Sequence, residues 1–141
     1  MKNYFLFIVL YFFFSLSFAQ QKDPWTKDQL MKTGELVEKM EKDDLKNTNL
    51  IHIGFEDVIP NSIDAGPGME EESLDKLRSI LSDIPKSETV VLYCGCCPMD
   101  VCPNIRPAFE LTKKLGYTNL KLLDIPTSIK ADWIDYDYPT K

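Results

Sequence analysis

Basic charge and histidine are scarce in this chain, and cysteine is confined to one short segment. The 16 Lys and Arg residues are outnumbered by 22 Asp and Glu, which gives a formal net charge of −6. Because nucleic-acid binding needs a basic face, this balance argues against a nucleic-acid partner. The only histidine, His52, lies in a predicted buried strand, where a histidine is more often a core residue than a base. A Cys–His catalytic pair would therefore depend on where that strand lies.

Long hydrophobic runs are absent after residue 19, and the run before it has the pattern of a targeting segment. Lys2 precedes the apolar stretch Leu6–Phe18, and Ser17–Ala19 has the small residues of a cleavage site. The stretch is too short for a membrane span, so we expect no stable membrane anchor. We predict a signal peptide over 1–19 and an exported protein, periplasmic or secreted. Residues 20–141 contain no repeats or low-complexity tracts and have the length of one domain.

The apolar residues of this domain follow helical and strand patterns in alternation. Thr26 with Gln29 resembles a capping box that opens a helical stretch to about Asp44. Strands are predicted at 50–55, 62–65, 89–93 and 120–125, and helices at 70–83 and 104–115. This alternation indicates a mainly parallel sheet covered by helices on both faces. We therefore predict a three-layer α/β sandwich, with Trp133 of the aromatic, acidic tail packed on the sheet.

All four cysteines follow directly on the predicted strand 89–93, at positions Cys94, Cys96, Cys97 and Cys102. Disulfides within so short a segment would close only small loops, so the clustering favours chemistry over stapling. A cysteine between a strand and a helix is well placed to be a reactive thiolate, because loop N–H groups and the helix dipole stabilise negative charge.

Two polar residues lie at the start of the helix that follows the cysteines. Asn104 is a candidate N-cap for that helix. Arg106 lies in its first turn, where a guanidinium group could bind an oxyanion or neutralise the loop.

The order of the elements and several short motifs resemble the rhodanese domain, over most of residues 20–141. The family's loop cysteine falls on Cys94, its glycine-tyrosine turn on Gly116–Asn119, its late tryptophan near Trp133, and its Ile-Pro-Gly-Ala turn on Ile59–Ser62. The chain departs from the family around the site. Its cysteine loop is longer than usual, and His52-Ile53-Gly54 stands where the family has Asp-x-Arg.

The resemblance implies a rhodanese-like sulfurtransferase that moves sulfane sulfur through a persulfide on Cys94. A small anionic sulfur donor and a thiol acceptor are the expected partners, with Gly95, Asn104 and Arg106 binding the donor. No cofactor and no metal are expected. The remaining cysteines, Cys96, Cys97 and Cys102, are candidates for relaying thiols or for a disulfide.

The cysteine loop is also compatible with two other functions. One is a non-catalytic thiol module that binds a soft metal or a partner. The other is a thiol–disulfide redox protein, whose loop would cycle between dithiol and disulfide.

Overall fold

One sheet of five parallel strands organises the computed structural model, which describes residues 22–141. The strand order is β1-β5-β4-β2-β3. The strands are β1 (Leu30–Lys32), β2 (Thr48–His52), β3 (Ile63–Asp64), β4 (Thr89–Tyr93) and β5 (Leu120–Asp124). The helices are α1 (Thr33–Glu41), α2 (Glu71–Ser82), α3 (Ile105–Lys114) and α4 (Ile129–Asp132), with short 3-10 turns at Lys27–Gln29 and Ile134–Tyr136.

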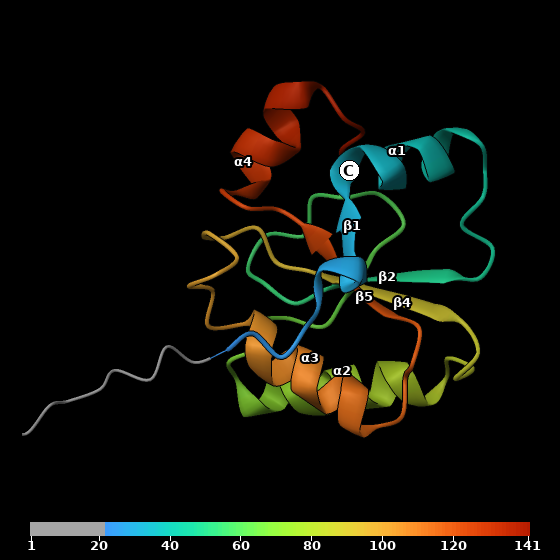
Figure 1. Cartoon of the computed structure of the whole chain (residues 1–141), viewed down its shortest axis with the longest axis vertical. Helices are drawn as coiled ribbons and strands as arrows, with labels where there is room; N and C mark the ends of the chain where they lie inside the picture. Colours follow the sequence, from blue (N-terminus) through green and yellow to red (C-terminus); the bar gives the residue numbers. More distant parts are fainter. Residues whose placement is uncertain (1–21) are drawn as a thin grey trace, which may run out of the picture.

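Helices cover both faces of this sheet, with α2 and α3 on one side and α1 and α4 on the other (Figure 1). The central strand β4 serves both sides, because successive side chains of a strand point to opposite faces. Its Val90 and Leu92 pack in the cluster beneath α2 and α3, and Val91 and Tyr93 in the cluster beneath α1 and α4. The predicted three-layer α/β sandwich is therefore confirmed.

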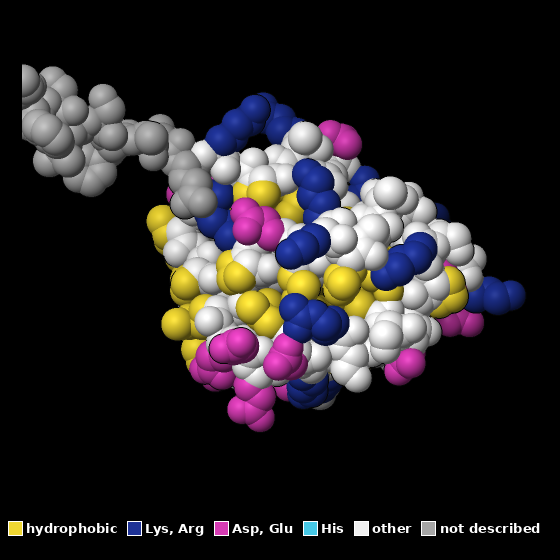
Figure 2. All heavy atoms as spheres, turned by 90° about the horizontal axis from the view of Figure 1, so that it is seen from below, with side chains coloured by type: hydrophobic (Ala, Val, Ile, Leu, Met, Phe, Trp, Pro, Cys, Tyr) yellow, Lys and Arg dark blue, Asp and Glu magenta, His cyan; other side chains and the backbone are white. Residues whose placement is uncertain are grey.

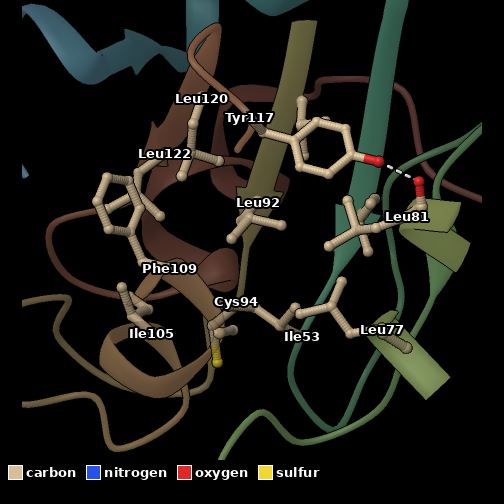
Figure 3. Close-up of a cluster of buried hydrophobic side chains, with 14 of the residues drawn as sticks. Ile53, Leu77, Leu81, Leu92, Cys94, Ile105, Phe109, Tyr117, Leu120 and Leu122 are labelled. Carbon is tan, nitrogen blue, oxygen red and sulfur yellow. Dashed lines mark hydrogen bonds between the residues drawn. The ribbon is translucent and has the colours of Figure 1, made fainter. Parts of the chain in front are cut away.

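The larger core lies between the sheet and α2 and α3 (Figure 3). Phe109 of α3 and Leu77 of α2 pack on the strands, and Tyr117 donates its hydroxyl to the carbonyl oxygens of Leu81 and, at 3.0 Å, of Ile84. Cys94 lies at the margin of the same cluster. The sheet therefore holds the first cysteine rigidly, because its main chain continues directly from β4.

The sequence pattern predicted a helical stretch over residues 26–44, but these residues are not helical throughout. Leu30–Lys32 instead form the edge strand β1, paired in parallel with β5, and α1 begins only at Thr33. Met31 is thereby buried on the α1 side of the sheet. Pairing with β5 overrides the helical spacing of the apolar residues, as tertiary context commonly does for short segments.

The other predicted elements agree with the structure apart from their ends, whereas α4 and the 3-10 turn Ile134–Tyr136 were not predicted. Trp133 is fully buried in the cluster beneath α1 and α4, as expected, and its Nε1–H donates to the Pro139 carbonyl at 2.8 Å. The outer face of α2 and α3 carries basic and acidic side chains among hydrophobic ones (Figure 2). None of the helices in residues 22–141 is long and apolar enough to cross a bilayer. The predicted signal peptide, 1–19, lies outside the described residues.

Candidate functional site

The carboxyl ends of β2, β3 and β4 meet at one edge of the sheet, as those of adjacent parallel strands do. His52 is in register with Tyr93 of β4 and with Asp64 of β3. Cys94 is the first residue after β4, so the cysteine loop opens beside His52. Ligand and reactive groups in open α/β sheets gather at this edge, and here it brings together a thiol, an imidazole and a carboxylate.

The four cysteines are free thiols, and their sulfurs gather at the start of the loop. Cys94 Sγ lies 3.2 Å from Cys96 Sγ, which lies 3.3 Å from Cys97 Sγ. The sulfurs of Cys94, Cys96 and Cys102 are all within 4.8 Å of one another. Cys94 and Cys102 are buried, whereas Cys96 is exposed. The cluster thus reaches from the core to the surface.

The Asn104 side chain holds two of these sulfurs by hydrogen bonds. Its side-chain Nδ2 donates to Cys94 Sγ at 3.4 Å and to Cys96 Sγ at 3.5 Å, while its Oδ1 accepts from the Met69 backbone N–H at 3.1 Å. Asn104 is the N-cap residue of α3, as predicted, but its side chain makes no capping hydrogen bond to the helix. The amide is instead fully buried and joins the sulfurs to the segment before α2.

Gly68 is required by the position of Asn104. A Cβ on Gly68 would stand 2.3 Å from the Asn104 carbonyl oxygen, which real structures do not allow. Glycine at this position lets the chain pass close against the start of α3, as glycine does at sites of backbone contact.

The pKa values of the thiols in the cluster are shifted in opposite directions. A hydrogen bond to Cys102, together with burial, raises the pKa of Cys94. The same hydrogen bond, accepted by Cys102, lowers the pKa of Cys102 to about 5, with help from the Asn104 backbone N–H. Burial raises the pKa of Cys97 to about 12. The hydrogen bond between the two residues therefore favours the thiolate form of Cys102 over that of Cys94.

His52 is buried beside Cys94, and only one of its two ring nitrogens has a partner. Nδ1 lies 2.8 Å from Asp64 Oδ1. Nε2 is the one buried side-chain polar atom without a hydrogen bond in residues 22–141. Nε2 and Cys94 Sγ each lie 2.9 Å from the position that a Cβ on Gly54 would occupy, so they are no more than twice that distance apart.

Sequence reasoning singled out neither Asp64 nor Gly54. The signal that could have found Asp64 is its place at the end of a strand next to β2, because parallel neighbours end at the same edge. The role of Gly54 had no sequence signal, since it depends on where two side chains of other residues lie.

A cavity of about 310 Å³ gives access to Cys94. Its walls come from the loop after β2, the cysteine loop and the start of α4: Phe55, Glu56, Cys94, Gly95, Cys96, Ser128, Ile129 and Lys130. Gly95 has a φ of +85° and accepts a hydrogen bond from the Ile129 N–H at 2.8 Å. A Cβ on Gly95 would stand 2.7 Å from the Cβ of Ile129, so only glycine lets this part of the cavity wall pack closely against the start of α4.

Arg106 lies away from these walls. Its guanidinium group donates to the Lys22 carbonyl at 3.2 Å and to the Asp23 carboxylate at 2.5 Å, and lies 5.4 Å from the centre of the Trp25 ring. The residue thus joins α3 to the segment before β1. The positively charged side chain in the cavity wall, within the described part of the chain, is Lys130.

These features define a parallel α/β protein with a cysteine cluster at the carboxyl edge of its sheet. No family model matches the chain, and no curated protein matches it. Among solved structures it is similar to a rhodanese-related protein from Thermoplasma volcanium, with a TM-score of 0.47 and 16% sequence identity. That similarity covers 80% of this chain and 97% of the other.

Proposed function

We propose that the protein is a rhodanese-like sulfurtransferase in which Cys94 carries sulfane sulfur as a persulfide. The observation that supports this most directly is the position of Cys94, which closes the central strand and lines the cavity. A nucleophile at such a place is held rigidly by the sheet and is reached by a small substrate from outside. Because 1–19 has the pattern of a signal peptide, we place this activity in an exported protein.

The reaction uses the thiolate of Cys94 and a donor such as thiosulfate. The thiolate attacks the outer sulfur of the donor, the sulfur–sulfur bond of thiosulfate breaks, and sulfite leaves with the electron pair. A thiolate acceptor then attacks the outer sulfur of the persulfide. This step returns the Cys94 thiolate and leaves the sulfur on the acceptor, so no external oxidant or reductant is consumed.

The Cys94 proton must leave before the attack, and His52 is placed to accept it. Its Nε2 is buried near Cys94 Sγ without another partner, and Asp64 holds the opposite side of the ring. This is the arrangement of nucleophile, base and orienting carboxylate that activates cysteines in other enzymes. Hydrogen bonds of this kind are often long before substrate binds.

Lys130 is the side chain we assign to binding of the anionic donor. It lines the cavity, and its Nζ pairs with Asp135 at 2.6 Å on the surface. An exposed ion pair of this kind contributes little free energy, so the ammonium group can turn to an anion at small cost. The loop's N–H groups assist, since the Cys96 backbone N–H already donates to Cys94 Sγ.

Cys96 is the best-placed thiol to pass the sulfur outward. It is exposed, and its sulfur lies 3.2 Å from that of Cys94. Attack by Cys96 on the outer sulfur of the Cys94 persulfide would move the sulfur from a buried to an exposed position. Cys97, which touches Cys96 but is not among the cavity-lining residues, has no such direct route.

Thiocyanate formation from thiosulfate and cyanide tests the proposal. We expect turnover by the wild-type protein, none by Cys94→Ser, and turnover within about twofold of wild type by Cys97→Ser, since Cys97 is the matched thiol outside the cavity. Far-ultraviolet circular dichroism of each variant controls for folding. Undiminished turnover by a folded Cys94→Ser variant would rule the proposal out.

A further inference from the structure

The contacts among the cysteine sulfurs point to a function beyond sulfur transfer. Persulfide chemistry needs one nucleophilic sulfur and at most one relay. Here Cys94, Cys96 and Cys102 bring three sulfurs within 4.8 Å of one another, all from a single loop after β4. Three thiolates spaced this closely match the separation of ligands that share one metal ion, whose bonds to sulfur are about 2.3 Å long.

Each of these three sulfurs also receives at least one N–H donor. The Cys96 backbone N–H points to Cys94 Sγ, and the Asn104 backbone N–H to Cys102 Sγ. The Asn104 side chain donates to Cys94 at 3.4 Å and to Cys96 at 3.5 Å. Donors of this kind orient metal-bound thiolates and offset their charge, so such hydrogen bonds are typical of the ligands of a metal site.

The donor set favours a soft cation that accepts three ligands. Thiolates select Cu(I) and zinc over harder ions. Zinc in structural sites takes four ligands in a tetrahedron. Cys97 is the next thiol along. Its sulfur contacts those of Cys96 and Cys102, but it lies outside the group of three sulfurs that are all within 4.8 Å of one another. Cu(I), by contrast, is stable with two or three thiolates in a plane.

We propose that Cys94, Cys96 and Cys102 form a mononuclear three-thiolate site for Cu(I), in which the Asn104 side chain donates hydrogen bonds to two of the sulfurs. Binding displaces the protons still held by these thiols, and the copper stays in the Cu(I) state throughout. Asn104 is fully buried and anchored to the Met69 N–H, so the sulfurs are held together before the ion arrives. Preorganisation of this kind raises affinity.

One consequence concerns the same sulfur that the proposed function uses. A thiolate that has donated an electron pair to Cu(I) is a much weaker nucleophile, and the ion bound to Cys94 also obstructs the approach of thiosulfate. Occupancy of the site would therefore inhibit sulfur transfer. This consequence rests on the proposed function, whereas binding of the ion does not. If Cu(I) binds but no variant or condition gives sulfur transfer, the proposed function fails and the metal site stands.

Competition against bathocuproine disulfonate, a coloured Cu(I) chelator, tests the site. The purified protein, fully reduced and kept free of oxygen, is titrated into the Cu(I)–chelator complex, and the loss of its absorbance gives stoichiometry and affinity. We expect one Cu(I) per chain. Cys94→Ser, Cys96→Ser and Cys102→Ser should each weaken binding by more than about tenfold, since even the loss of a group that hydrogen-bonds to a metal ligand costs that much. Cys97→Ser, the matched control, should change affinity less than about threefold.

Three outcomes would overturn the proposal. The first is an absence of competition with the chelator. The second is a loss in Cys97→Ser as large as in the other variants, which would indicate a four-thiolate site of the zinc type. The third is more than one Cu(I) per chain, which would indicate unspecific thiol binding. Melting temperatures of the metal-free variants show whether any lost affinity reflects lost folding.

Discussion

His52 and Asp64 face each other across the ends of β2 and β3, with 2.8 Å between Nδ1 and Oδ1. Burial opposes the ionisation of Asp64. The hydrogen bonds from His52 and from the Gly66 N–H, together with the charge of Lys76, outweigh this effect, so the pKa of Asp64 is lowered. An ionised carboxylate only accepts hydrogen bonds, so Nδ1 is the donor in this contact, and in the neutral ring Nε2 is then the nitrogen with the lone pair. Asp64 thus fixes the tautomer in which His52 can take a proton from Cys94.

Replacement of His52 by asparagine tests this role of Nε2. An asparagine Nδ2 can still donate to Asp64, but no acceptor reaches Cys94. We expect sulfur transfer to fall by about 100-fold at neutral pH, the range of general-base catalysis. The loss should shrink as the pH rises, because hydroxide then ionises Cys94 without a base. A uniform loss at every pH would indicate a structural role for His52 and contradict this account.

Gly54→Ala tests whether His52 and Cys94 must approach each other. The new Cβ would lie 2.9 Å from both Cys94 Sγ and His52 Nε2, so one of them must move. We expect a loss of stability of about 1–3 kcal/mol from overpacking, and a loss of sulfur transfer larger than stability explains. Urea unfolding measures the loss of stability, and the thiocyanate assay measures the loss of sulfur transfer.

Gly34→Ala is the matched control, because its Cβ would meet only the Tyr138 hydroxyl at an ordinary 3.6 Å. Gly34 lies in α1, where alanine is favoured over glycine by about 1 kcal/mol, so this variant should be at least as stable as wild type. If Gly54→Ala has the same stability and the same rate of sulfur transfer as Gly34→Ala, the close approach of His52 and Cys94 is not needed for function.

Lys130→Ala and Arg106→Ala separate two candidates for anion binding. Lys130 lines the cavity, whereas Arg106 is engaged with Asp23 and Trp25. We expect Lys130→Ala to raise the KM for thiosulfate about five- to tenfold, the value of one solvent-exposed charge contact. Arg106→Ala should leave that KM unchanged and lower thermal stability slightly. The reverse pattern in steady-state kinetics would return the donor-binding role to Arg106.

Asp57 gives a prediction for acid stability. Burial opposes its ionisation, but hydrogen bonds from Lys141, Ser62 and Tyr93 outweigh this and lower its pKa below the ordinary 3.8. A group whose pKa is lowered by folding stabilises the protein above its unfolded value, and that stability is lost as the pH falls through the folded value.

Asp57→Asn should therefore cost about 1–2 kcal/mol at pH 7, where the charged hydrogen bonds to this partly exposed group are lost. The difference from wild type should narrow as the pH falls below 3.8. Urea unfolding at a series of pH values measures it. A difference that stays constant with pH would show that the charge of Asp57 does not matter.

The sequence was informative where one residue type or a periodic pattern carries the signal. The strand before Cys94, the helices after residues 70 and 104, and the burial of Trp133 all follow from local patterns, and the structure has them. The edge strand β1 could not be predicted in this way, because Leu30–Lys32 are a strand only through pairing with β5.

The site shows the same division. The position of Cys94 follows from its place in the sequence. The partners of its sulfur do not, since Asn104, His52 and Gly54 meet it through three different segments. Asn104 was expected to cap α3, a local role, whereas its side chain makes contacts that only the folded loop brings within reach.

The mass of the intact protein before and after incubation with thiosulfate tests the central claim most directly. We predict a gain of one sulfur atom that is removed by cyanide or a thiol and that is absent in Cys94→Ser. A gain that persists in Cys94→Ser, or no gain by wild-type protein with its thiols reduced, would contradict the account. A loss of two hydrogens in place of a gain would identify thiol–disulfide chemistry instead.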